Sequence, residues 1–92
     1  MSEAVLLSIT GRVQGVGYRA WTLREARRRA LRGWVRNRLD GSVEALFIGE
    51  ADKIADMISL CRKGPMLAQV DGISRLPAPD DNSMDFSERP TS

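Results

Sequence analysis

The chain of 92 residues is long enough for one small domain with a modest core and too short to split into two domains. Hydrophobic residues make up 42% and charged residues 28%, an ordinary globular composition that argues against a disordered chain and against a membrane span. The absence of histidine removes the commonest general base, and the single cysteine, Cys61, excludes an internal disulfide and paired-cysteine zinc sites. The first residues lack the features of a signal peptide, so we expect a cytoplasmic protein.

The first half of the chain predicts a strand, a helix and a hairpin. Residues 4–10 alternate apolar and polar side chains with the two-residue period of a half-buried strand. Residues 18–32 carry apolar residues at helical spacing, and Gly33 is expected to end this helix in the left-handed conformation. The runs 34–39 and 42–48 are strand-like and are joined by Asp40-Gly41, a strong hairpin signal.

The second half predicts an amphipathic helix over 51–62, a strand over 67–76 and a loop rich in Pro and Asp over 77–83. Residues 84–87 can form a short edge strand before a frayed end. The order β-α-β-β-α-β indicates an α+β, ferredoxin-like split βαβ sandwich, in which two helices cover one face of an antiparallel sheet. We expect one domain over residues 1–92.

The sequence GRVQGVGYRAW, residues 11–21, connects the first strand to the first helix. Glycines in this loop let successive backbone N–H groups turn toward one point, and the helix that follows adds its positive N-terminal end, so the loop is typical of an anion nest. Arg19 can offer a planar fork of donors to a phosphate or carboxylate there. The glycine spacing is that of neither standard nucleotide loop, and a plain tight turn with a solvated arginine stays an alternative.

Asn37, in the run GWVRNRLDGS, has the strand parity of Val35 and Leu39, which places its amide on the face that these neighbours would bury. An amide in that position needs hydrogen-bond partners. Groups of the turn around Asp40-Gly41 could supply them. If the first two strands belong to one sheet, however, Asn37 can converge with the glycine-rich loop on a shared site.

Three segments together resemble the acylphosphatase family: GRVQGVGYRAW, then GWVRNRLDGSVE, then CRKGP. The resemblance covers residues 5–76 and includes the order and spacing of the segments. It implies a hydrolase of acyl phosphates that uses no metal and no cofactor and releases a carboxylic acid and inorganic phosphate. Two departures stand out: Arg38 follows Asn37 where some members have a small hydroxyl residue, and the C-terminal run lacks the usual aromatic strand ending, which puts the edge strand in question.

The resemblance also implies roles for particular residues. Arg19 would bind the phosphoryl group and Asn37 would orient the attacking water. The phosphate cradle would be formed by the backbone of the loop, with Gln14 at its edge, followed by Gly15, Val16, Gly17, Tyr18 and Arg19. The expected partner is a small acyl phosphate, with inorganic phosphate or sulfate as the bound anion. We expect a monomer that binds no nucleic acid and no membrane.

Two other functions fit the same architecture. An RNA-binding module would need exposed aromatic residues on its central strands, and that signature is absent from the predicted strands. A non-catalytic anion sensor would keep the nest but would have no need of Asn37. We interpret Arg27, Arg28 and Arg29 as a solvated charge run on the outer face of a helix, and Trp21 and Trp34 as packing residues.

Overall fold

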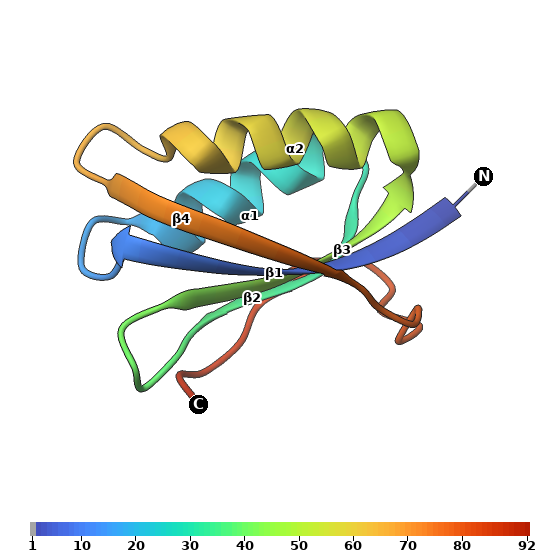
Figure 1. Ribbon diagram of the computed structural model, residues 1–92. Helices are drawn as coiled ribbons and strands as arrows, with labels where there is room; N and C mark the ends of the chain where they lie inside the picture. The colour runs from blue at the N-terminus through green and yellow to red at the C-terminus, as the bar shows by residue number, and fades with distance from the viewer. Residues whose placement is uncertain (1) are drawn as a thin grey trace.

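The computed structural model describes residues 2–92 and has a five-stranded sheet with two helices on one face (Figure 1). The elements follow in the order β1 (Ser2–Arg12), α1 (Tyr18–Arg28), β2 (Arg32–Asn37), β3 (Val43–Glu50), α2 (Ala51–Lys63), β4 (Gln69–Pro77) and β5 (Phe86–Glu88). This is the predicted sandwich, and each predicted boundary lies within two residues of the observed one except the end of α1. Neither helix within residues 2–92 has the length and apolar character that a crossing of a lipid bilayer requires.

The strands lie in the order β4-β1-β3-β2-β5. The first four pair antiparallel, as predicted, whereas β5 pairs in parallel with β2, so the complete sheet is mixed. Phe86 anchors β5, because its side chain is fully buried and stacks on Phe47 with ring centroids 5.5 Å apart. Beyond β5, the N–H of Ser92 still donates to the carbonyl of Asn37, so the tail follows β2 where fraying was expected.

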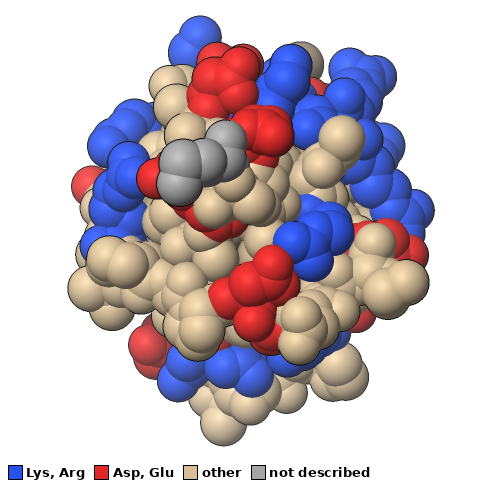
Figure 2. All heavy atoms as spheres, turned by 90° about the vertical axis from the view of Figure 1, so that its right-hand side faces the viewer, with Lys and Arg blue, Asp and Glu red and all other residues tan. Residues whose placement is uncertain are grey.

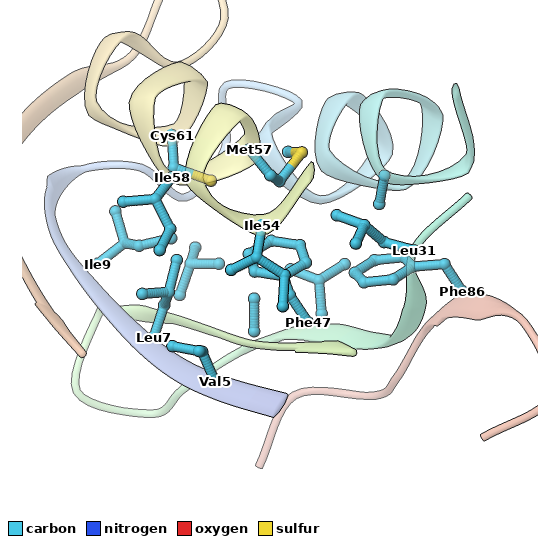
Figure 3. Packing of buried hydrophobic residues seen from close by; sticks show 14 of the residues in the cluster. Val5, Leu7, Ile9, Leu31, Phe47, Ile54, Met57, Ile58, Cys61 and Phe86 are labelled. Atoms are coloured by element: carbon cyan, nitrogen blue, oxygen red, sulfur yellow. The ribbon is translucent and has the colours of Figure 1, made fainter. Parts of the chain in front are cut away.

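The core lies between the sheet and the helices (Figure 3). Alternate residues of β1, namely Val5, Leu7 and Ile9, point into it, as the two-residue period requires. Buried residues of α2 pack against them. They recur at the spacing i, i+3, i+4 and i+7 of an amphipathic helix: Ile54, Met57, Ile58 and Cys61. Tyr18 and Ala26 of α1 belong to the same buried cluster, so packing on the core also holds α1 against the sheet, with its start at the glycine-rich loop.

The predicted end of α1 is wrong. The helix ends at Arg28, one turn before the expected Arg32. The N–H of Leu31 donates to the carbonyl of Ala26, and Ala30 takes the left-handed conformation with φ 55°, which is the hydrogen-bond pattern of a Schellman cap. Ala30 therefore takes the left-handed conformation that ends the helix, whereas the sequence pattern predicted that Gly33, three residues later, would take it.

Gly33 instead lies inside β2, where it has φ 127°. A Cβ atom at this position would lie 1.9 Å from the carbonyl oxygen of Leu46 on β3. The glycine is required by this close approach of two strands and not by the helix end.

The β2–β3 hairpin is confirmed, but its connection is longer than the dipeptide. The N–H of Arg38 donates to the carbonyl of Ser42, and the N–H of Gly41 donates to the carbonyl of Arg38, which leaves three residues in the loop. Only Gly41 has a positive φ, of 95°, as a type I turn followed by a left-handed residue requires. Leu39 lies in this loop and is 87% exposed, so it does not share the burial of Val35.

Candidate active site

The loop between β1 and α1 is shaped by two glycines in the left-handed region. Gly15 has φ 74° and Gly17 has φ 80°, and a Cβ atom at either position would meet no atom within 4 Å. The glycines are therefore needed for backbone conformation and not for close packing. They leave open space beside the start of α1, and this space is where an anion nest would bind its ligand.

The N-terminal end of α1 has no acceptor from the protein's side chains within residues 2–92. Its N-cap is Gly17, no side chain caps it, and its first turn contains no acid. Helix N-termini usually carry Ser, Thr, Asp or Asn at the cap, because the first N–H groups of a helix lack partners inside it. This end combines unpartnered donors with the positive end of the helix dipole, an arrangement that favours an anion.

A hollow of about 170 Å³ lies beside this end. It is lined by Val13, Gly15, Gly17, Tyr18, Arg19, Ala20, Asn37 and Glu88. Arg19 belongs to α1 and Asn37 to the last position of β2, so the fold brings the two candidate residues to one hollow. Of the predicted loop residues, Gly15, Gly17, Tyr18 and Arg19 line it, whereas Gln14 and Val16 do not.

Gln14 holds the glycine-rich loop in place through two hydrogen bonds. Its Nε2 donates to the backbone carbonyls of Arg38 and Ser42, each at 2.8 Å, and so ties the loop to the β2–β3 hairpin. The neighbouring Val16 packs against the main core and anchors the loop there. Both residues hold the loop in shape. Gln14 does not line the hollow, whereas we expected it at the edge of the phosphate cradle.

Asn37 is half-buried and pairs through its backbone with Val43. Its side-chain amide makes no hydrogen bond to any residue of the described chain, so the turn around Asp40-Gly41 does not satisfy it. Ser42, and not Asn37, takes the acceptor that this turn offers, because the carboxylate of Asp40 accepts from the N–H and hydroxyl of Ser42. Asn37 lines the hollow, and its carboxamide is left without a partner among residues 2–92.

Sequence reasoning missed Glu88. The residue lies at the end of β5, lines the hollow, and places Oε1 4.0 Å from Nε of Arg19. Its position depends on the parallel pairing of β5 with β2, in which Glu88 is opposite Val35. No local pattern in a tail that was expected to fray could have indicated this contact between residues so far apart in sequence.

The phenol of Tyr18, which lines the hollow, and the thiol of Cys61, which contacts Tyr18, are buried in their neutral forms. The hydroxyl of Tyr18 donates to the backbone carbonyl of Cys61, at 2.7 Å, and burial raises the pKa of this phenol well above its usual value. Burial also raises the pKa of the Cys61 thiol to about 12. Neither group supplies an anionic base near neutral pH.

The basic run on α1 is largely engaged within the protein. Arg27 donates to the carbonyl of Phe86, and Arg29 pairs with Glu25 at 3.0 Å, whereas Arg28 is mostly exposed. At the end of the molecule away from the glycine-rich loop, Lys and Arg lie next to Asp and Glu (Figure 2). This face therefore carries charges of both signs, unlike the one-sided positive surface that is typical of a nucleic-acid footprint.

The chain is similar in sequence and in structure to known proteins of one family. Residues 5–88 match the family model described as Acylphosphatase. The chain is 62% identical over 69 residues to an acylphosphatase of Nitrobacter hamburgensis, covering 75% of this chain and 70% of the relative. It is 44% identical over 89 residues to an acylphosphatase of Rhodospirillum rubrum, covering 97% and 98%. The crystal structure of acylphosphatase from Bacillus subtilis superposes with a TM-score of 0.91 at 33% identity, covering 97% of this chain and 99% of that one.

Proposed function

The chain belongs to the acylphosphatase family, enzymes that hydrolyse acyl phosphates, and we propose that the hollow between the glycine-rich loop and β2 is where it does so. The observation that carries this proposal is the meeting of Arg19 and Asn37 at one hollow beside an uncapped helix N-terminus. Arg19 supplies a cation that can bind a phosphoryl group, and Asn37 supplies an amide that can orient a water molecule.

The phosphoryl group is held by the loop and Arg19. Backbone N–H groups between Gly15 and Arg19 donate to the phosphoryl oxygens, and the positive end of α1 adds to the attraction. The guanidinium of Arg19 is charged at every physiological pH and provides several donors in one plane. As charge spreads over the phosphoryl oxygens during the reaction, these donors stabilise it without having to move.

Asn37 orients the attacking water. Its carboxamide oxygen accepts a hydrogen bond from the water and thereby directs a lone pair of the water oxygen at phosphorus. The bond from that oxygen to phosphorus forms as the bond between phosphorus and the acyl oxygen breaks. The electron pair of the broken bond leaves with the carboxylate, and the proton of the water passes to a phosphate oxygen or to that carboxylate.

Among residues 2–92, the hollow is lined by no base stronger than the carboxylate of Glu88, and this fits the substrate class. A carboxylate is a good leaving group, so the enzyme has mainly to neutralise charge and align the water. Arg19, Asn37 and the loop all come from one chain, which supports a monomer as the active species. We also infer that inorganic phosphate, or sulfate in its place, binds the hollow, and that the protein acts in the cytoplasm.

Hydrolysis of benzoyl phosphate by Arg19→Ala and Asn37→Ala variants tests the proposal. We expect Arg19→Ala to lower kcat/KM by about 1000-fold or more, since binding and charge neutralisation are both lost. Asn37→Ala should lower kcat by about 100-fold with a much smaller change in KM, because it removes alignment and not binding.

Arg24→Ala is the matched control, because Arg24 is an exposed arginine on the same helix and lines no part of the hollow. Its kinetics should equal those of the wild type. Folded Arg19→Ala or Asn37→Ala protein with wild-type turnover would refute the assignment of that residue. Tight phosphate binding without any turnover by the wild type would instead indicate an anion sensor.

A further inference from the structure

A carboxylate lies in the hollow proposed for a phosphate dianion. Glu88 and Arg19 both line this hollow, and Oε1 of Glu88 is 4.0 Å from Nε of Arg19. Their side chains are 39% and 37% exposed, so solvent reaches the pair. Among residues 2–92, neither side chain has another ion-pair partner. The proposed mechanism uses Arg19 but leaves Glu88 without a role.

The position of Glu88 is set by the sheet and not by chance contact of a mobile tail. Phe86, two residues earlier, is fully buried, and its carbonyl accepts from the guanidinium of Arg27. The N–H of Arg89, one residue later, donates to the carbonyl of Val35 at 2.8 Å. The backbone is therefore held on both sides of Glu88, which keeps this residue beside the hollow.

We propose that Glu88 sets the affinity of the site for phosphoryl groups, an inference that rests on the function proposed above. Its carboxylate is paired with Arg19 when the hollow holds no anion. An entering phosphoryl group competes for that guanidinium and meets the negative charge of Glu88 nearby. Both effects weaken the binding of substrate and of product phosphate to a similar degree, because both ligands present the same phosphoryl oxygens.

This role accounts for a carboxylate in a site that is otherwise built to attract anions. Loop donors, helix dipole and guanidinium together would hold inorganic phosphate as well as they hold the substrate. Uniform tight binding lowers KM without raising kcat, and it also delays release of the product. A single negative charge beside Arg19 in the hollow shortens the residence of phosphate.

The test compares Glu88→Gln, Glu88→Asp and Glu3→Gln with the wild type. Glu3 is exposed on β1, does not line the hollow and provides a control for the loss of one negative charge. Calorimetric titration with inorganic phosphate gives Kd directly, and hydrolysis of benzoyl phosphate gives kcat and KM. Phosphate binding is measured without turnover, so it reports on Glu88 even if the protein proves inactive.

For Glu88→Gln we expect the Kd of phosphate and KM to fall together by about 3- to 10-fold, with kcat changed less than about 2-fold. Glu88→Asp keeps the charge and should stay close to the wild type, as should Glu3→Gln. A purely structural role of Glu88 would lower Tm and leave the Kd of phosphate unchanged.

Two results would overturn the inference: equal phosphate affinity in Glu88→Gln and wild-type protein, or no phosphate binding by either. Normal wild-type turnover with equal affinities would refute only the role of Glu88. Tighter phosphate binding by Glu88→Gln in a protein without hydrolytic activity would refute only the proposed function.

Discussion

The first N–H groups of a helix lack partners inside it, and α1 and α2 differ in what interacts with these groups. Both helices follow a strand and lie on the same face of the sheet (Figure 1). α2 begins directly after β3 and has Asp52 in its first turn, so an acid of the protein interacts with the helix dipole. α1 begins after a loop with Gly17 at its cap, without an acid in its first turn.

The comparison shows how a fold reserves one helix end for a ligand. A protein acid at α1 would stabilise the helix but would occupy the donors that a phosphoryl group needs. Glycine provides the left-handed turn while adding no acceptor, and the positive charge of the helix end is left for an external anion. The stability lost at α1 is offset by the packing of its buried residues, such as Tyr18 and Ala26, against the core.

Among the changes that test this comparison of the two helix ends, making α1 resemble α2 has the largest expected effect. Ala20 lies in the first turn of α1 and lines the hollow, so Ala20→Glu places an acid at a favourable helix position and in the anion site. We expect the Kd of phosphate and KM for benzoyl phosphate to rise about tenfold or more, while Tm stays equal or increases. Titration with phosphate and thermal unfolding measure the two effects separately.

Ala20→Gln is the matched control, because it has nearly the same size without the charge. It should change the Kd of phosphate far less than Ala20→Glu does. If the two variants weaken phosphate binding equally, bulk and not charge is responsible, and the electrostatic contrast between the helix ends is incorrect.

A second change tests what holds the start of α1 in place. α2 needs no brace because it follows β3 without a loop, whereas the loop before α1 depends on two hydrogen bonds from Gln14 to the β2–β3 hairpin. Gln14→Leu should lower the free energy of unfolding by about 1–3 kcal/mol, since two partly buried carbonyls lose a donor. We also expect kcat/KM to fall about tenfold, because Arg19 and Asn37 lose their alignment.

Gln69→Leu controls for the loss of an amide, since Gln69 is exposed on β4. It should have little effect on either unfolding or hydrolysis. A Gln14→Leu protein with reduced stability and unchanged kcat/KM would show that the brace supports the hairpin alone.

The residues at the start of α1 can be predicted from the sequence more fully than the residues from other segments that surround them. Arg19 and the glycines lie within one short motif whose chemistry is local, and Asn37 has a strand parity that can be counted. Glu88 reaches the hollow only through the pairing of β5 with β2, a contact between distant segments that no periodicity encodes. The role of Gln14 likewise depends on how the hairpin folds back onto the loop.

The wrong helix end has a related cause. Glycine is the usual left-handed residue after a helix, and Gly33 was the first one available after the apolar pattern. The structure uses Ala30 in the left-handed conformation and reserves Gly33 for the close approach of β2 to β3. Tertiary packing overrides a local preference that is worth only about 1 kcal/mol.

The smallest predicted effect is at α2. Asp52→Asn removes the only acid in its first turn and should lower the free energy of unfolding by about 0.3–1 kcal/mol at low ionic strength, less at high salt. Denaturant unfolding at two salt concentrations measures this, with Asp56→Asn, an exposed acid one turn further along α2, as control. Phosphate affinity and kcat/KM should stay at wild-type values, because Asp52 does not line the hollow. An equal loss of stability in Asp56→Asn, or weaker phosphate binding in Asp52→Asn, would remove the distinction between a helix end stabilised by the protein and one reserved for the ligand.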